Sequence, residues 1–397
     1  MLIISNPNAG NRQGPDFIRQ HVTWFIDEFM PPTVVPEVKQ TTKEGDAGAF
    51  ALEYIRQNAR KDRVTILVSG GDTTIHEIIQ HVESSLQTKT DLPRVDIALL
   101  PMGTANALYY SEFPPERTED ICKTFDPRVQ RRLATLDKET RGNLLSLSAL
   151  CSDLPSTPLT IARSSIYDAK GTLSASVFSV VVVSSCTSEA IPLNYPLRLI
   201  LALHAVILHE AEALRHTHPG LERFKIAAMQ NITRWSSATL QLPDGYSIYN
   251  PVTHSFEETV SGSSTTLEGP FAYFLSTVNV DRLELAFNIT PLASTLPAVE
   301  PGFEIIVVRP VKDPSINGTD EAARQAFATK VGAVLMVAYQ QGAHVKWRYG
   351  NDGQPVGFDD SDGGFLVEYL RAPSWVWVPA SRPNLVQWHI LTIWPGG

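Results

Sequence analysis

Three short glycine-containing segments have residue types and a spacing that suggest chemistry. They are Asn6-Pro7-Asn8-Ala9-Gly10, Ser69-Gly70-Gly71-Asp72-Thr73-Thr74 and Pro101-Met102-Gly103-Thr104-Ala105-Asn106. Glycines let backbone N–H groups approach a phosphate closely, and the N-terminus of a following helix adds partial positive charge. Each segment directly follows a predicted strand, so all three are expected at the carboxyl edge of one sheet, where open α/β sheets bind ligands. The sequence therefore predicts a phosphate site built from three turns.

Two other interpretations of these turns, ordinary strand-to-helix turns and a P-loop, fit the sequence less well than a phosphate site. Ordinary strand-to-helix turns use the same residue types, but three of them at one sheet edge make that interpretation the weaker one. A P-loop needs a Gly-Lys-Ser/Thr sequence, which none of the three turns contains.

The elements that must position these turns follow from hydrophobic periodicity. Strands are predicted at residues 2–4, 33–39, 64–68 and 95–100, and helices after Pro15, at 46–60 and at 74–82. The uninterrupted apolar and β-branched run at 64–68 is typical of a strand buried on both faces of a parallel sheet. This alternation predicts an α/β domain with an open, Rossmann-like sheet.

After about residue 140 the pattern changes to short strands separated by turns. Strands are predicted at 144–150, 159–166, 175–184, 271–278, 303–308 and 365–370, with one clear helix at 196–214. Residues 236–268 are polar and turn-rich, which favours a hairpin or loop excursion. The pattern predicts a β-rich, antiparallel, sandwich-like second domain. We place the two domains at 1–135 and 136–397, with the last strand as a candidate to return to the first domain.

Composition limits the classes of partner. A chain of 397 residues suggests two domains. Its 42 acidic residues exceed its 33 basic ones. This balance disfavours binding to bulk nucleic acid and disfavours electrostatic attachment of a polybasic segment to anionic membranes. The N-terminus does not resemble a signal peptide, and the longest apolar stretch, residues 196–208, is too short to span a bilayer. We therefore expect a cytoplasmic protein that meets membranes only peripherally and transiently.

Metal-binding side chains show no convincing pattern. Cys122, Cys151 and Cys186 are too few and too scattered for a disulfide framework or a cysteine-based zinc site. The four histidines between residues 204 and 218 lack the i, i+4 spacing of a helical metal site, which favours a polar helix face. Five of the seven tryptophans lie in the last 51 residues. Core packing of strands is the favoured interpretation, and a lining for an acyl chain or a membrane contact is the alternative.

The three turns together resemble a known family. In order and spacing, residues 6–10, 70–77 and 100–108 look like the catalytic domain of diacylglycerol kinases and sphingosine kinases. The resemblance covers about the first 110 residues. It implies a nucleotide domain related to NAD kinases, a β-rich domain that holds a lipid, and transfer of the γ-phosphoryl group of ATP to a lipid hydroxyl. Sphingoid bases and diacylglycerols are the lipids it suggests.

The resemblance also implies roles for individual residues. Asp72 would act as general base on the lipid hydroxyl or orient it. Glu189 and Glu210 are candidate carboxylates near the lipid head group. The nucleotide would be bound by Asn6, Pro7, Asn8, Thr42, Gly70, Gly71, Thr73, Thr74, Glu77, Gly103, Thr104, Asn106 and Arg223. Phosphoryl transfer depends on positioning and charge neutralisation, so Mg²⁺ is implied, held by phosphates, waters and a carboxylate such as Asp72.

The sequence departs from the family pattern at two places. Thr73 stands where the family has the third glycine of Gly-Gly-Asp-Gly, and a β-branched residue would resist a positive φ there. The family also has an Asp-Gly-Glu near its C-terminus, whereas the near match here is Asn351-Asp352-Gly353-Gln354. A pseudokinase that binds lipid or nucleotide without turnover is therefore the first alternative. An NAD kinase-like enzyme with a small-molecule acceptor is the second.

Overall fold

The glycine turns belong to a four-stranded parallel sheet. The computed structural model describes residues 1–85, 92–168, 170–181, 202–218, 220–258, 264–298, 300–357, 364–380 and 385–393. The strand order is β2-β1-β3-β4, formed by β1 (Leu2–Ser5), β2 (Glu37–Gln40), β3 (Arg63–Gly70) and β4 (Arg94–Pro101). All neighbouring strands pair in parallel, which confirms the predicted α/β class of this domain.

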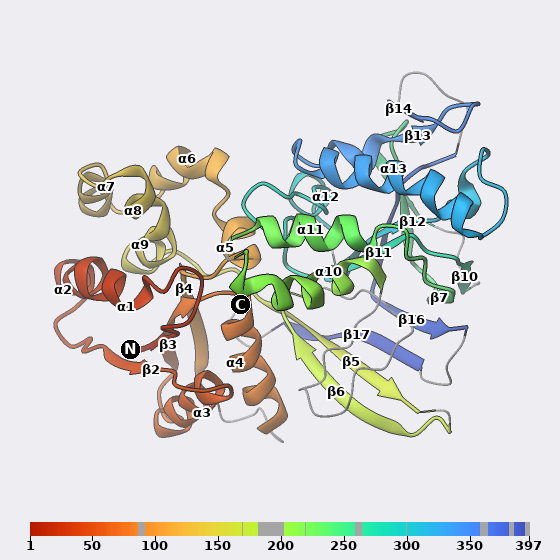
Figure 1. Cartoon of the computed structure of the whole chain (residues 1–397). Helices are drawn as coiled ribbons and strands as arrows, with labels where there is room; N and C mark the ends of the chain where they lie inside the picture. Colours follow the sequence, from red (N-terminus) through yellow and green to blue (C-terminus); the bar gives the residue numbers. More distant parts are fainter. Residues whose placement is uncertain are drawn as a thin grey trace.

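Helices follow each strand of this sheet (Figure 1). The chain after β1 forms α1 (Gly14–Phe17), the π-helical turn η1 (Ile18–Val22) and α2 (Thr23–Phe29). After β2, β3 and β4 come α3 (Asp46–Gln57), α4 (Asp72–Ser85) and α5 (Ala107–Glu112). Further along are η2 (Pro115–Arg117), α6 (Thr118–Cys122), α7 (Pro127–Leu133), α8 (Lys138–Asn143) and α9 (Leu145–Cys151).

The strand predicted at 144–150 is wrong, because this segment forms the helix α9. Its apolar residues are leucine and alanine, which favour helix, and it contains no β-branched residue. The hydroxyl of Ser146 accepts a hydrogen bond from the backbone N–H of Leu99 at 3.0 Å, so α9 is attached to β4. The helices through Cys151 therefore pack with the first sheet, and the division of the chain after residue 135 stays a prediction.

The second domain is built on two antiparallel sheets, which confirms its β-rich character. The six-stranded sheet has the order β10-β7-β16-β17-β5-β6, and the five-stranded sheet has the order β11-β12-β15-β8-β9. The first contains β5 (Thr160–Tyr167), β6 (Leu173–Ser179), β7 (Ala238–Leu242), β10 (Thr265–Glu268), β16 (Ser374–Pro379) and β17 (Leu385–Ile393). The second contains β8 (Ser247–Asn250), β9 (Ser255–Glu258), β11 (Tyr273–Thr277), β12 (Phe303–Val308) and β15 (Glu368–Ala372).

Two expectations about these strands need correction. β17 does not return to the first domain, since it pairs with β5 and β16 in the six-stranded sheet as far as Ile393. Residues 236–268 are more than a loop excursion. They do form the β8–β9 hairpin, but β7 and β10 are members of the six-stranded sheet.

Aromatic side chains fill the space between the two sheets. Trp375, Trp377 and Trp388 are buried there, and the rings of Trp375 and Trp388 stack with centroids 6.0 Å apart. Phe274 of β11 meets both Trp375 and Trp377 from the opposite sheet. For these three tryptophans the core interpretation is confirmed, because burial of large rings is what holds the sandwich together.

Helices cover the other face of the five-stranded sheet (Figure 1). They include α10 (Ala202–Ala213), η3 (Leu214–His216), α11 (Glu222–Asn231) and α13 (Glu321–Ala338). The shorter elements are α12 (Leu292–Thr295), η4 (Pro310–Lys312), η5 (Ala343–Lys346) and the hairpin of β13 (Arg348–Tyr349) and β14 (Pro355–Val356). Of the helix predicted at 196–214, the described part forms α10 and η3, and residues 196–201 lie outside the described residues. Neither α11 nor α13 was predicted. In the described part of the chain, no helix combines the length and the hydrophobicity needed to cross a membrane.

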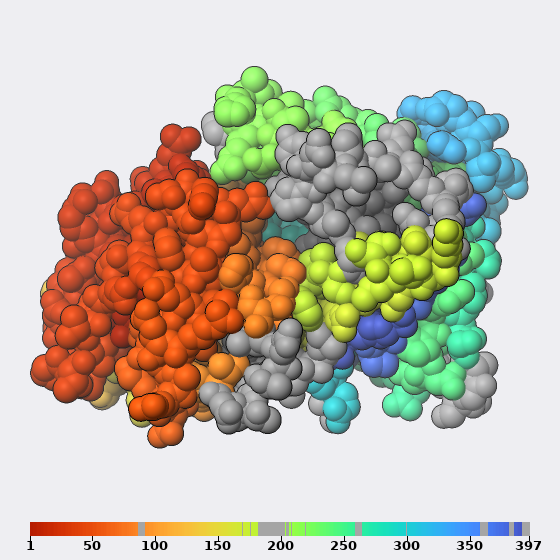
Figure 2. All heavy atoms as spheres, turned by 90° about the horizontal axis from the view of Figure 1, so that it is seen from below, coloured from red at the N-terminus to blue at the C-terminus, as the bar shows by residue number. Residues whose placement is uncertain are grey.

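The two domains lie side by side and touch at several points. In Figure 2 the first domain, in red and orange, borders the yellow-green strands β5 and β6. The backbone N–H of Phe178 in β6 donates to the side chain of Gln80 in α4 at 2.7 Å. On another part of the boundary, Arg282 pairs with Glu116 of η2 at 2.7 Å.

Candidate functional site

The three glycine turns meet at the carboxyl ends of β1, β3 and β4. A Cβ added to Gly103 would lie 2.4 Å from the Cα of Gly71, and one added to Gly10 would lie 2.4 Å from the backbone oxygen of Met102. Gly10 also has a φ of 49°, in the left-handed region. The backbones of the turns therefore touch directly, which requires glycine at these positions. This confirms that the residues singled out in the sequence come together.

Asn106 closes the third turn. It lies in the left-handed region with a φ of 54°, where asparagine is tolerated better than most residues. Its side-chain oxygen accepts a hydrogen bond from the N–H of Gly103 at 2.9 Å, and its amide donates to the backbone oxygen of Pro101 at 3.1 Å. The buried side chain of Asn106 thus stabilises the turn by hydrogen bonds to its backbone, while Thr104 in the same turn is half-buried.

The first turn is tied to the second through side chains. The amide of Asn6 donates to the hydroxyl of Thr74 at 3.1 Å, and the oxygen of Asn6 accepts from the N–H of Asn8 at 3.0 Å. Thr74 is buried, and its side chain lies where a Cβ on Gly70 would clash, at 2.6 Å from the Thr74 oxygen. Asn6, Gly70 and Thr74 therefore hold the turns in place, and Pro7 and Asn8 form the outer part of the first turn.

Asp72 lies at the centre of this arrangement as the first residue of α4. Its two carboxylate oxygens accept hydrogen bonds from the N–H groups of Ala107 and Leu108 at 2.8 and 3.0 Å. The carboxylate thus caps the N-terminus of α5, where an anion is stabilised by the helix. Burial raises the pKa of Asp72, and the bonds from Leu108 and Ala107 oppose that shift. The backbone N–H of Asp72 itself is a third donor, so of the roughly four lone-pair sites of the carboxylate one stays available for a ligand.

Thr73 does not disturb the turn. It follows Asp72 inside α4, its side chain is exposed, and it is not among the described residues with a positive φ. The backbone at Thr73 therefore does not need the positive φ that a β-branched residue would resist. A glycine is therefore not required at this position for the backbone to form the turn.

A second loop approaches the turns from the start of α3. The side chain of Asp46 accepts bonds from the N–H and the hydroxyl of Thr42, both at 2.8 Å. The hydrogen bond from the backbone N–H of Thr42 contributes most, and together with the bond from the hydroxyl it holds the pKa of Asp46 below its usual value. Glu77 of α4 accepts a bond from the N–H of Ala47 at 3.0 Å. Burial raises the pKa of Glu77, and the bond from Ala47 opposes this. Glu77 therefore positions the loop that carries Thr42.

Arg215 of the second domain borders the first turn, and Arg223 lies on the following helix. Arg215 of η3 donates to the backbone oxygen of Asn8 at 3.5 Å and pairs with Glu212 at 3.0 Å. Sequence reasoning missed Arg215, because no motif or spacing marks it. Arg223 of α11 is buried, donates to the backbone oxygen of Gly220 at 3.3 Å, and has its pKa lowered by burial.

The other predicted residues are less well placed. Glu210 is half-buried on α10, and its role at the substrate stays a prediction. Glu189 lies outside the described residues. The near match to the C-terminal family motif, around Asp352, forms the turn between β13 and β14, at the end of the molecule away from the first domain (Figure 1). It therefore cannot supply an acid to the glycine turns.

The residues at the turns could hold Mg²⁺ through one carboxylate, with phosphates and water as the other ligands. Within the described ranges, no group of three or more His, Cys, Asp or Glu side chains is arranged to hold a metal ion. Mg²⁺ keeps several waters and commonly uses one or two carboxylates together with substrate phosphates. Asp72 offers one carboxylate, so an ion here would rest mainly on phosphate oxygens and water.

Comparison with known proteins agrees with this geometry. Residues 1–136 match the model of the diacylglycerol kinase catalytic domain. Curated relatives include a probable lipid kinase YegS-like of Cronobacter sakazakii, 31% identical over 118 residues, or 30% of this chain and 34% of the relative. A protein with the same description from an Enterobacter species is 30% identical over 119 residues, again 30% and 34% of the two chains. The match thus spans about a third of each relative, and the resemblance noted in the sequence is confirmed for the first domain.

Proposed function

We propose that the chain is an ATP-dependent lipid kinase, proceeding from the diacylglycerol kinase catalytic domain matched by residues 1–136. ATP would lie in the cleft between the domains, with its phosphates on the three turns. The observation that carries the proposal is the direct contact of the turns around Asp72. Backbone N–H groups at such turns bind phosphate without a basic surface, which is compatible with an acidic chain.

Asp72 would receive the proton of the lipid hydroxyl. In the proposed step the hydroxyl oxygen bonds to the γ-phosphorus, the bond from that phosphorus to the bridging oxygen of ADP breaks, and the proton passes to a carboxylate oxygen. Burial raises the pKa of Asp72, which brings the carboxylate closer to the range in which a base works at neutral pH. Mg²⁺ would supply charge neutralisation of the phosphates.

Arg215 would add positive charge at the same place. It reaches Asn8 across the domain boundary, so closure of the two domains would bring it toward phosphates on the first turn. Arg223 would support it from α11. The lipid would approach from the second domain, and the cytoplasmic location and transient membrane contact remain predictions.

The test is transfer of radiolabelled phosphate from ATP to sphingoid bases and diacylglycerols in mixed micelles. We expect Asp72→Asn to lower kcat by at least about 100-fold, the low end of what general acid–base groups contribute. ATP binding should change less than about threefold, since the glycine turns remain. Asp120→Asn is the matched control, because Asp120 is an exposed carboxylate of the same domain, paired with Lys123. Wild-type protein that yields no labelled lipid above the Asp72→Asn background would overturn the proposal.

A non-catalytic protein that binds lipid or nucleotide is the second candidate. It is favoured by the position of Asp352, which leaves Asp72 without an acid from that motif. It predicts ATP binding by calorimetry together with an absence of labelled product. The NAD kinase-like alternative is separated by adding NAD as acceptor in the same assay.

A further inference from the structure

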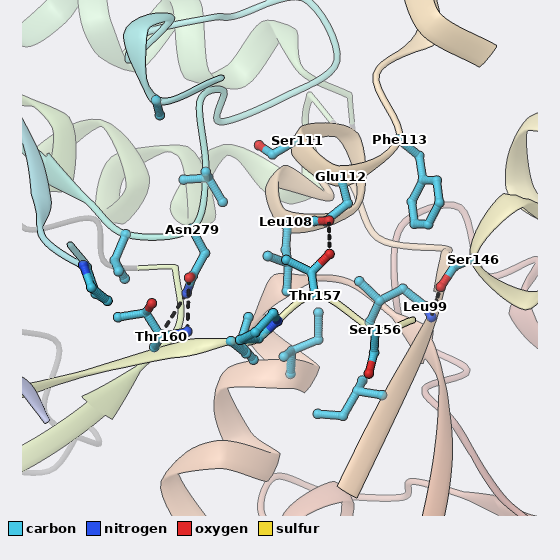
Figure 3. A pocket seen from close by; sticks show the side chains of 18 of the residues that line it. Leu99, Leu108, Ser111, Glu112, Phe113, Ser146, Ser156, Thr157, Thr160 and Asn279 are labelled. Carbon is cyan, nitrogen blue, oxygen red and sulfur yellow. Dashed lines mark hydrogen bonds between the residues drawn. The ribbon is translucent and has the colours of Figure 1, made fainter. Parts of the chain in front are cut away.

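A cavity lies at the junction of the two domains. Its volume is about 590 Å³, within the range of small-molecule sites. It runs along β4, the edge strand of the parallel sheet, and is closed by α5, α9 and the segments around residues 154–160 and 278–281. Figure 3 shows side chains from these elements converging on it.

This cavity is separate from the glycine turns. Its lining includes Ile75 and Leu108 but no residue of the three turns. The helix α5 stands between the two places: Asp72 caps its first residue, and Glu112, its last residue, lines the cavity. Six helical residues rise about 8 Å, which is enough to divide two ligands.

The cavity is lined by the carboxylates of Asp96, Glu112, Asp281, Glu300 and Glu304 and by the guanidinium of Arg63, which pairs with Asp96. Asp96 pairs with Arg94 at 3.0 Å, Asp281 with Arg282 at 2.9 Å, and Glu304 with Arg371 at 2.8 Å. These three carboxylates are therefore neutralised by the protein itself.

Glu112 differs from these three arginine-paired carboxylates. The hydroxyl of Thr157 donates a hydrogen bond to the carboxylate of Glu112 at 3.2 Å (Figure 3). Among the ion pairs of the described residues, none supplies a cation to Glu112. Its side chain is exposed to solvent, but desolvation by the surrounding protein raises its pKa; the hydrogen bond from Thr157 opposes this shift and the charge of Asp281 adds to it. A cation in the cavity would therefore relieve an unfavourable charge.

Apolar surface lies next to this carboxylate. Leu99 of β4, Ala149 and Leu150 of α9 and Leu154 of the linker line the cavity. The N–H of Leu99, which the edge strand would otherwise leave open, donates to Ser146. This wall therefore suits a hydrocarbon group rather than a polar one.

We propose that the cavity is a second ligand site and that it binds a small amphipathic amine. The ammonium group lies on Glu112 and Thr157, and the alkyl part lies against β4 and α9. With Asp96, Asp281 and Glu304 paired to arginines, Glu112 and Glu300 leave the cavity with a net negative charge. This charge disfavours phosphates and fatty acids, so we expect no competition from ATP or a phosphorylated lipid product. The site does not depend on the proposed kinase activity.

The test uses three probes of equal length, hexylamine, 1-hexanol and hexanoate, titrated into the whole chain by saturation-transfer NMR. At neutral pH hexylamine is a cation, since its pKa resembles that of lysine. We expect saturable hexylamine binding with a Kd on the order of 1 mM, as a ligand of seven heavy atoms allows. Hexanoate should not bind, and saturating ATP should not displace the amine.

Variants locate the site. Glu112→Gln should weaken hexylamine about tenfold, to the level of hexanol, because the charge is lost and the shape is kept. Glu258→Gln, which removes an exposed carboxylate on β9, should leave binding unchanged. Ala149→Phe should block both hexylamine and hexanol by filling the cavity, and circular dichroism checks that each variant is folded. The proposal is overturned by any of four results: equal binding of hexanoate, displacement by ATP, unchanged binding in Glu112→Gln, or no saturable amine binding.

Discussion

Gly103 has no room for a side chain. A Cβ would lie 2.4 Å from the Cα of Gly71, and both atoms belong to backbone that cannot swing aside. We expect Gly103→Ala to push the two turns apart, lowering the free energy of unfolding by about 1–3 kcal/mol, as overpacking does. ATP affinity should fall by at least about tenfold, because the phosphate-binding N–H groups move together with the turns. Urea denaturation and calorimetric titration with ATP measure both effects.

Gly142 provides the matched control in the same domain. It lies in α8 with no atom within 4 Å of an added Cβ. Gly142→Ala should therefore keep ATP binding and leave stability unchanged or raise it by up to about 1 kcal/mol, since alanine favours helix. If Gly103→Ala bound ATP as tightly as Gly142→Ala, the close contact of the turns would not be needed for phosphate binding.

Motif residues were the part of the site best predicted from sequence. Gly10, Gly71 and Gly103 met as expected, because each follows a strand of one parallel sheet. The effect of Thr73 could not be predicted, since the φ of a single residue depends on where the helix begins. Arg215 could not be found at all, because it reaches Asn8 from a segment more than 200 residues later in the chain.

At the scale of elements, His344 joins η5, the short helix after α13, to the backbone of Ile289. It lies in η5, is fully buried, and its Nε2 lies 3.1 Å from the backbone oxygen of Ile289. Burial lowers its pKa to about 4, and the bond to Ile289 only partly opposes this. The unfolded chain therefore binds a proton more readily than the folded one between about pH 6.5 and 4. Stability is complete above that range and is lost as the pH falls through it.

We expect His344→Gln to remove this dependence. From pH 7 to pH 4 the wild type should lose up to about 3 kcal/mol more of its free energy of unfolding than the variant, while other titrating groups act equally on both. An amide at this position can still donate to Ile289, which limits the cost at pH 7. Urea denaturation at pH 7, 6, 5 and 4 gives the comparison. Parallel pH profiles of the two proteins would show that His344 does not carry the effect.

Helices of the second domain were the elements hardest to predict. α13 is rich in alanine and valine, and its residues Phe327, Val331 and Val334 are buried in the core beside the five-stranded sheet. Its apolar residues are not confined to a narrow stripe, so helical periodicity is weak. α9 was taken for a strand because a run of seven largely apolar residues fits either structure when length alone decides.

At the scale of the molecule, two domains and their classes followed from length and pattern, but their contact did not. The boundary is made by pairs far apart in sequence, such as Gln80 with Phe178 and Glu116 with Arg282. No local pattern encodes such pairs. The acidic balance of the chain likewise disfavoured binding to bulk nucleic acid but gave no sign of the cavity beside Glu112.

Substitutions of Arg282 and of Glu116, which pair across that boundary, should lower the stability of the protein by different amounts. Arg282 and Asp281 are almost fully buried, with side chains 6% and 4% exposed, whereas Glu116 is 54% exposed. Arg282→Leu leaves the buried Asp281 without its cation, which costs about 3–5 kcal/mol. Glu116→Gln loses an exposed pair worth at most about 1 kcal/mol. In calorimetry we expect Tm to fall by roughly 5–10 °C for Arg282→Leu and by less than about 3 °C for Glu116→Gln. Equal shifts would mean that the pair across the boundary, rather than the buried Asp281, holds the domains together.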